Sequence, residues 1–441
     1  MILTTLKDVP VIDNETPVAE PMNNSFKDRA MTGEQQPSSA AYSQDDRAAL
    51  ARMLNLAMAD ASARGETLNL DTSEEIPRII PLLCAYFSQE ELAELVGKKV
   101  AGKILKMYRT EMLQNLFLEG ELQRVLHAFS DAGIPLMLFK GPALAYTIYP
   151  RPHLRTYHDI DALISENDIP RARDLLVQMG YEFYEEYRSN TIDKTRSGYN
   201  FTLKRPDSWL EVLIELHTAP HASEIGSNFD VALLWSRAQS ITVLGEQALT
   251  LHPIDHLLYL CWHYRFHGFT RLLWLYDIVA LLRAFRDTLD WDELVRTAQH
   301  QNMAATLYYC CTWCHDLFGV PVPSHVLTKL RPPLLCRLLV ERITISNPAQ
   351  VLASASGRSR RVVAHHAIVD STTRLLQAGL TAFFPPPAVL ARRYMDTSRL
   401  PLQLFFLYYL IHPWSTLAKG ISYLLHAKRK REKIPEREGR A

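Results

Sequence analysis

The sequence has few cysteines, no net charge and no long uninterrupted apolar run. Its six cysteines among 441 residues lie in apolar stretches without regular spacing, which argues against a disulfide framework and indicates small core residues. The first residues lack the sustained apolar segment of a secretory signal. We therefore expect a protein of the reducing cytoplasm.

The 48 basic and 48 acidic residues cancel. This balance removes the broad positive surface expected of a protein that grips extended nucleic acid. A small-molecule, peptide or protein partner is favoured instead.

The longest apolar stretch, Leu400 to Trp414, contains two prolines, a glutamine and a histidine. It is shorter than the run of about 20 residues that spans a bilayer, so we expect no transmembrane segment. The stretch leads towards a basic end, KRKREK. Core packing explains it, and peripheral contact with an anionic membrane is the minor alternative.

A chain of this length is expected to form two or three packed units with tails. Residues 1–40 are rich in Pro, Asn, Ser, Gln and acidic residues, a composition typical of a disordered leader. Changes in apolar periodicity predict the other boundaries: a helical N-terminal segment at 41–130, an α/β core at 131–250, a helical domain at 251–330, and a helical extension with a basic tail at 331–441.

Short apolar runs alternate with helical patterns inside the predicted core. The runs PLMLFK, DIDALIS, YEFYEEY, YNFTLK and WLEVLIELH are typical of strands. The segments PALAYTIY and IPRARDLLVQMG are typical of helices, the second ending at Gly180. The pattern predicts an α+β fold built on a small mixed sheet.

Two carboxylates in DIDALIS carry the first chemical signal. Residues two apart in a strand face the same side, so Asp159 and Asp161 project together while the aliphatic residues between and after them face the core. A buried pair of like charges is costly unless a cation neutralises it. Oxygen ligands favour Mg²⁺ or Mn²⁺.

The strand WLEVLIELH presents Glu211, Glu215 and His217 on one face and aliphatic residues on the other. Glu215 is the candidate for a third carboxylate, which would help two metal ions hold a triphosphate or act as a general base. Glu211 is interpreted as a solvated residue or as one that pairs across a hairpin. His217 is placed around the metal ligands, capping the strand or bonding a carboxylate.

A turn at Lys140-Gly141-Pro142 follows the first strand. Glycine there would let the backbone approach a ligand, and the N–H groups of the next helix would face phosphate. Arg155 would add a charge-assisted contact, with Lys140 as the weaker candidate for the same role.

These residues resemble the uncharacterised bacterial nucleotidyltransferase family, in the superfamily that shares its fold with DNA polymerase beta and aminoglycoside adenylyltransferases. The resemblance covers roughly residues 95–320 and rests on sequence segments that read LFKGPALAYTIY, HLRTYHDIDALI, MGY, IELH and HYRFHGFTRLLWLYDIVALL. It implies a nucleoside-triphosphate pocket, Asp159 and Asp161 as metal ligands, Glu215 as the third carboxylate, and a helical domain closing over the acceptor.

Other residues carry two interpretations each. Arg271 and Asp277 match the family pattern and would reach the acceptor, although an interdomain ion pair explains them equally well. His263 is placed with this acceptor group. It shares a helix with His256 and His267, and packing histidines explain this spacing better than zinc.

The segment from Cys311 to His315 matches a c-type haem attachment pattern. That pattern requires an exported protein. Since the segment lies in an apolar helical stretch, a packed helix face is the better account.

The predicted activity is transfer of a nucleoside monophosphate, with AMP from ATP as the first candidate, to a hydroxyl-type acceptor. The competing hypothesis is a non-catalytic nucleotide-binding or scaffold protein that keeps the fold. Pro142, which offers no N–H to a phosphate, favours this competitor. Convergence of the three carboxylates beside Gly141 would favour the enzyme.

Overall fold

The computed structural model describes residues 44–63, 76–188, 197–203, 210–220, 229–269, 271–340, 368–387, 390 and 406–418. The predicted leader, the turn near Pro206 and the basic end of the chain lie outside these residues. Within the described part of the chain, no helix combines the length and apolar character needed to cross a membrane.

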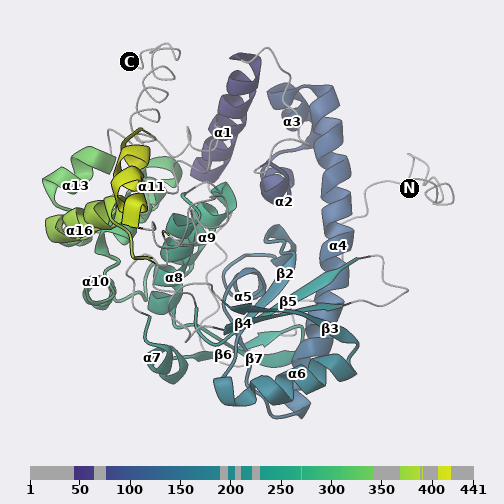
Figure 1. The fold of residues 1–441 in the computed structure, drawn as a ribbon. Coiled ribbons are helices and arrows are strands. Elements are labelled where there is room, and N and C mark those ends of the chain that lie inside the picture. The colour runs from purple at the N-terminus through teal and green to yellow at the C-terminus, as the bar shows by residue number, and fades with distance from the viewer. Residues whose placement is uncertain are drawn as a thin grey trace. The chain divides into compact units, whose positions relative to one another are not determined.

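Among the described residues, four helices precede the sheet: α1 (Gln44–Ala63), α2 (Ile76–Tyr86), α3 (Gln89–Val96) and α4 (Lys98–Asp131). The start of α3 is fixed by a capping box, in which Ser88 Oγ accepts from the Glu91 N–H and Glu91 accepts from the Ser88 N–H. In Figure 1, α4 extends from α3 at one end to the sheet at the other. Its buried residues Leu122, Val125 and Phe129 belong to the core beneath the sheet.

Seven strands form one mixed sheet in the order β3-β4-β5-β2-β1-β7-β6. Their bounds are as follows: β1 (Met137–Leu138), β2 (Asp159–Leu163), β3 (Tyr181–Arg188), β4 (Ser197–Leu203), β5 (Val212–His217), β6 (Gln239–Val243) and β7 (Glu246–Thr250). The central pairs β2–β5 and β1–β7 are parallel, and the other pairs are antiparallel. The predicted α+β class with a mixed sheet is confirmed.

The hairpin β6–β7 was not among the predicted strands. Its two strands are joined through Leu244 and Gly245, which have φ values of 54° and 87°. Such a two-residue turn with positive φ suits the twist of a hairpin. The Leu-Gly pair between the alternating sequences SITV and EQALT is the signal that marks it.

The two faces of the sheet pack into different cores. Ile160, Ala162, Ile214 and Leu216 join the core that α4 and α6 (Ile169–Gln178) complete. The alternate residues face the other way, and Leu163 joins a core made largely by the helices after the sheet. The carboxylates of β2 and β5 therefore lie on the same face as Leu163, opposite the face that α4 and α6 cover.

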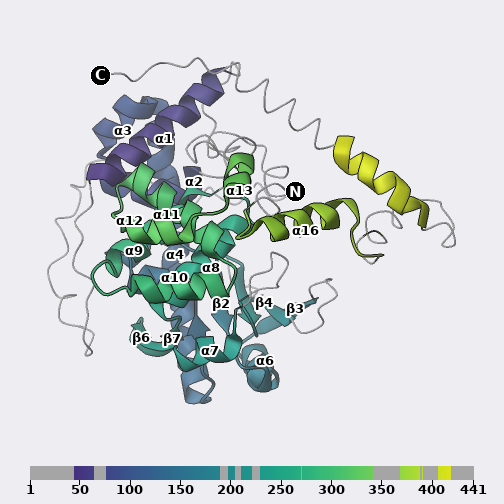
Figure 2. The ribbon, with the colours of Figure 1, turned by 90° about the vertical axis from the view of Figure 1, so that its left-hand side faces the viewer.

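Short helices α5 (Gly141–Thr147), η1 (Pro152–Leu154) and η2 (Glu166–Asp168) connect the first strands. The later helices are α7 (Val231–Ser236), α8 (Pro253–Phe266), α9 (Leu272–Ala284), α10 (Trp291–His300), α11 (Ala304–Phe318), α12 (Ser324–Leu330), α13 (Leu334–Leu339) and α16 (Thr372–Phe383). Residues 408–418 are also helical. Figure 2 shows α9 to α12 gathered between α1 and the strands.

The cysteines of the haem-like segment lie inside this helical packing. Cys310, Cys311 and Cys314 of α11 are fully buried, as is Cys261 of α8. His315 uses its Nδ1 in a 3.1 Å contact with the Val320 carbonyl. These placements agree with the packed-helix interpretation.

A buried ion pair links the sheet to α9. Arg155, just before β2, donates from Nε and Nη2 to the two carboxylate oxygens of Asp277 at 2.6 and 2.9 Å. Tyr149 donates to the same carboxylate at 2.7 Å. Because Arg155 is 7% exposed and Asp277 is 0% exposed, neither charge has water to replace its partner.

A second buried carboxylate links α1 to the same helix. Asp46 accepts hydrogen bonds from Tyr86, Tyr276 and Arg283. Tyr276 and Asp277 are neighbours on α9, so α9 holds both the N-terminal helices and the sheet.

Breaking the Arg155–Asp277 pair should strongly destabilise the protein. We expect Arg155→Met to lower the free energy of unfolding by about 3–5 kcal/mol, because it leaves the Asp277 charge buried without its partner. Urea unfolding measures this change. The matched control is Lys329→Met, which removes an exposed ion pair with Asp292 and should change stability far less, because water replaces the lost partner. Equal losses in both variants would contradict the prediction.

Candidate active site

The parallel pairing of β2 and β5 brings the predicted carboxylates together. Asp161 stands opposite Glu215 in the strand register, and Asp159 stands opposite Leu213 two residues earlier. His217, two residues beyond Glu215, lies on the same face. Asp161 is therefore the central carboxylate, with acidic neighbours along its own strand and across the sheet.

Lys140 and His217 both contact Asp161 Oδ1. The Lys140 ammonium lies 2.6 Å from this oxygen, and His217 Nε2 lies 3.1 Å from it. His217 Nε2 is also 3.4 Å from Glu215 Oε2. The Asp161 side chain is 2% exposed and that of Glu215 is 25% exposed, so Glu215 is the carboxylate more open to solvent.

The pKa values reflect this crowding. Burial, together with the charges of Asp161 and Glu215, raises the pKa of Asp159 to about 7 in spite of Lys140 and Arg155. Burial also disfavours charge on Asp161, but Lys140 and His217 outweigh it and hold the pKa of Asp161 well below its usual value. The pKa of His217 is raised because its bonds to Asp161 and Glu215 outweigh burial.

The donor chemistry fits a divalent cation. Asp161, Glu215 and His217 can each offer one ligand atom, and these atoms lie within 4.8 Å of one another. Asp159 adds a third carboxylate on the same face. Carboxylate oxygens suit Mg²⁺ or Mn²⁺, and an imidazole that bonds the ligating carboxylates is a common means of orienting them.

The structure thus brings together Asp161 and Glu215 from the predicted metal triad. It places His217 in direct contact with both. Asp159 lies two residues before Asp161, the residue that stands opposite Glu215. Ligation by Asp159, Asp161 and Glu215 stays a prediction.

The turn at Lys140-Gly141-Pro142 is tightly packed. Gly141 begins α5, a helix of seven residues, and is buried. A Cβ built on Gly141 would lie 2.5 Å from the Tyr157 Cβ. This glycine is required for close packing between the turn and the segment before β2, whether or not it also approaches a ligand.

His256 of α8 holds the strand end that precedes this turn. Its Nε2 lies 3.0 Å from the Phe139 carbonyl oxygen, where an imidazole N–H donates. The Phe139 ring meets His217 edge-on at 5.5 Å and Tyr259 at 5.1 Å between ring centroids. Phe139 and His256 therefore position the backbone that carries Lys140.

The remaining predicted residues occupy the surroundings of the carboxylates. All three guanidinium nitrogens of Arg155 donate within the protein, two to Asp277 and one to the Thr156 carbonyl. The partner of Asp277 is thus Arg155. A contact between Arg155 and a nucleotide stays a prediction, although each of its three nitrogens already donates within the protein.

An aromatic cluster follows on α8 and α9. The Arg271 guanidinium stacks over Trp274 at 4.3 Å. His263 meets the same Trp274 ring at 4.4 Å and stacks on Tyr259 at 6.0 Å. Tyr259 connects this cluster to the ring of Phe139 beside the carboxylates.

Two residues near the site were missed by the sequence interpretation. Tyr259 is fully buried, and its phenol is one of the groups that raise the pKa of Lys140 against the effect of burial. Partial burial, followed by the charges of Arg78 of α2, Arg155 and Arg271, lowers the pKa of His158, the residue before Asp159. The apolar setting of Tyr259 concealed it, and Arg78 lies too far away in sequence for any motif to include it.

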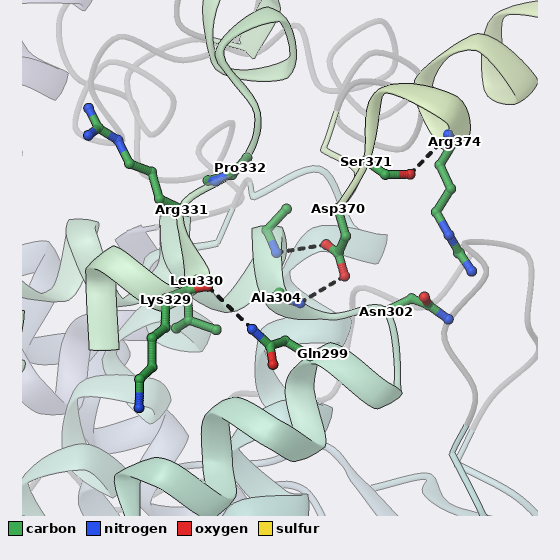
Figure 3. A pocket seen from close by; sticks show the side chains of 11 residues that line it. Gln299, Asn302, Ala304, Lys329, Leu330, Arg331, Pro332, Asp370, Ser371 and Arg374 are labelled. Carbon is green, nitrogen blue, oxygen red and sulfur yellow. Dashed lines mark hydrogen bonds between the residues drawn. The ribbon is translucent and has the colours of Figure 1, made fainter. Parts of the chain in front are cut away.

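A separate hollow of about 280 Å³ lies among α10, α11, α12 and α16 (Figure 3). Asp370 points into the start of α11, where it accepts from the N–H groups of Ala304 and Ala305 at 3.1 and 2.8 Å. These bonds satisfy free N–H groups of α11. None of the predicted site residues lines the hollow.

Comparison with known proteins identifies the region that holds this site. A family model described as "Uncharacterised nucleotidyltransferase" matches residues 76–319. No curated protein matches the chain. The crystal structure of an antigenic nucleotidyltransferase-like protein from Paracoccidioides brasiliensis is similar at 13% identity, covering 46% of this chain and 96% of that chain, with a TM-score of 0.27.

Gly141→Ala should destabilise the turn. We expect a loss of about 1–3 kcal/mol of unfolding free energy, because the new methyl group overlaps Tyr157 and the backbone must shift. Thermal unfolding measures the effect. Gly120→Ala in α4 is the control, since its Cβ would meet nothing within 4 Å and should leave the helix unchanged or more stable. A neutral Gly141→Ala would show that the turn is not tightly packed.

His256 should make stability fall in acid. Burial lowers the pKa of His256 from 6.5 to about 4, so between these pH values the unfolded chain takes up a proton that the folded protein excludes. Its contribution is complete above pH 6.5 and is lost as the pH falls towards 4, by up to about 3 kcal/mol. His256→Gln does not titrate and keeps an N–H donor. Urea unfolding across this range should show a steeper loss in the wild type, and parallel curves would refute the assignment.

Proposed function

The chain belongs to the uncharacterised nucleotidyltransferase family, and we propose that it transfers a nucleoside monophosphate, with AMP from ATP as the first candidate, to a hydroxyl group on a small molecule or peptide. The acceptor oxygen would attack the α-phosphorus, the bond to the β-phosphate oxygen would break, and pyrophosphate would leave. A cytoplasmic location is part of the same proposal.

The observation that carries this proposal is the group of acidic side chains on one sheet face. Asp159, Asp161 and Glu215 are the residues that would hold Mg²⁺ or Mn²⁺, which when bound supplies positive charge for the triphosphate. His217, bonded to Asp161 and Glu215, orients these carboxylates. A scaffold that binds no nucleotide would leave this arrangement without a chemical purpose, whereas a non-catalytic nucleotide-binding protein would still use it to hold a metal ion.

Lys140 is the residue that would meet the triphosphate oxygens. Its ammonium already lies beside Asp161, and its pKa is raised because Asp161, Tyr259 and Asp159 outweigh burial. The side chain therefore remains charged at physiological pH. A fixed cation in a buried site stabilises the charge that grows on the leaving phosphates.

Glu215 is the candidate base for the acceptor hydroxyl. It is the more exposed of the two carboxylates that contact His217, so an acceptor can approach it from solvent. Accepting the hydroxyl proton would leave the acceptor oxygen free to attack. Arg271 and His263, on the aromatic cluster next to Tyr259, are the candidates for holding the acceptor.

Label transfer tests the activity directly. The full chain is incubated with each of the four nucleoside triphosphates labelled at the α-phosphate, with Mg²⁺ or Mn²⁺ and cell extract. We expect one triphosphate to label an acceptor, and Asp161→Asn to reduce that labelling at least about 100-fold, because it removes the central carboxylate of the site.

Two controls separate the alternatives. Glu211→Gln changes an exposed carboxylate next to β5 and should leave labelling unchanged. Label placed on the γ-phosphate should not reach the acceptor, since it leaves with pyrophosphate. Labelling that survives Asp161→Asn would overturn the proposal, and a thermal shift with ATP and Mg²⁺ without any labelling would favour the non-catalytic alternative.

A further inference from the structure

The helix at residues 408–418 exposes large apolar side chains to solvent, unlike an ordinary surface helix. Its buried residues are Tyr408 and His412, one turn apart, while Leu410, Ile411 and Trp414 are exposed by 64%, 49% and 72%. Leu417 extends the exposed face by a further turn. A surface helix normally buries its apolar side and exposes its polar side.

Helix α16 carries a matching apolar stripe. Leu376 and Leu380 are exposed by 63% and 62%, and their spacing of four residues places them along one face of the helix. Phe384, the residue that follows the helix, is exposed by 56%. The two segments are joined, because Tyr409 donates to the Pro385 carbonyl and His412 Nε2 lies 3.1 Å from the Ala382 carbonyl oxygen. In Figure 2 the yellow helix lies beyond α16, away from the sheet. We call these seven exposed residues of the two segments the C-terminal apolar surface.

Charge is unevenly distributed around this surface. Residues 406–418 contain no Asp, Glu, Lys or Arg, and α16 contains only Arg374. Residues 368–441 carry 12 basic and 5 acidic residues, a net charge of +7, and the rest of the chain carries −7. Five of the six residues from 428 to 433 are basic.

We propose that the C-terminal apolar surface docks on an anionic lipid bilayer. Leucine, isoleucine, phenylalanine and tryptophan side chains would enter the boundary between head groups and acyl chains, while the basic residues that follow would lie against anionic head groups. The helices lie on the bilayer and do not cross it. This inference does not depend on the proposed catalytic activity.

Charge favours a bilayer over a second copy of the chain. Two copies that met through this surface would bring together two segments of net charge +7, and like charges repel. An anionic membrane provides the opposite charge and an apolar layer at once. Nucleic acid would satisfy the basic residues but would give the exposed leucines no apolar partner.

Vesicle sedimentation tests the proposal with the full chain. We expect the protein to sediment with phosphatidylcholine vesicles that contain phosphatidylglycerol and to remain in solution with phosphatidylcholine alone. Raising the salt from about 0.1 to 1 M, which shortens the Debye length from about 10 to 3 Å, should reduce binding. Binding that ignores both lipid charge and salt would overturn the proposal.

Paired variants locate the contact. Leu410→Glu with Trp414→Glu should weaken binding to the anionic vesicles at least about tenfold, because two charges replace the inserted side chains. The matched control is Leu113→Glu with Leu116→Glu on α4, which alters residues that are 63% and 66% exposed and should bind like the wild type. Equal losses in both pairs would contradict the assignment.

Sedimentation without vesicles addresses the competing partner. We expect wild-type protein and the Leu410/Trp414 variant to have the same mass in solution. A wild-type dimer that the variant converts to monomers, combined with no vesicle binding, would overturn the proposal in favour of a second copy.

Discussion

Three carboxylates on one face of two neighbouring strands set the central constraint of this protein. Asp161 is buried, and Asp159 and Glu215 are half-buried beside it, so charge on all three is costly without positive charge nearby. Lys140 supplies part of that charge and His217 bonds Asp161 and Glu215, yet burial, together with the charges of Asp161 and Glu215, still raises the pKa of Asp159 to about 7. A site with this much clustered negative charge is well suited to a divalent cation and to the phosphates that such a cation brings.

The rest of the fold fixes the position of Lys140 relative to the carboxylates. The two-residue strand β1 is too short to fix its own end, so the Phe139 carbonyl is held by His256 from α8 and the Gly141 turn is packed against Tyr157. On the other side of β2, the Arg155–Asp277 pair anchors the strand to α9. The His256 hydrogen bond and the Arg155–Asp277 ion pair are both out of water, where a lost partner is costly to replace.

Local pattern was sufficient to predict β2, β5 and the facing of their side chains, because alternation between apolar and acidic residues reports which side is buried. It could not predict which strands would be neighbours. That pairing alone places Glu215 opposite Asp161, and it makes His217 a direct contact of both carboxylates. Asp277, the partner of Arg155, is 122 residues away in sequence, and Arg283, a partner of Asp46, is 237 residues away. Sequence spacing does not predict contacts at such separations. Buried polar contacts between distant segments are decided by tertiary packing.

The net charge of zero conceals an uneven distribution of charge along the chain. A total of zero argued against an extended nucleic-acid surface, yet it is the sum of a C-terminal part at +7 and a remainder at −7. The exposed leucines and Trp414 of the C-terminal apolar surface distinguish the binding partners that charge alone would allow, because only a bilayer offers anionic and apolar layers together. The acidic remainder, which contains the catalytic candidates, would be repelled by the same membrane. The uneven charge therefore favours lipid contact through the helices at 372–383 and 408–418 over contact through the acidic part of the chain that holds the carboxylates.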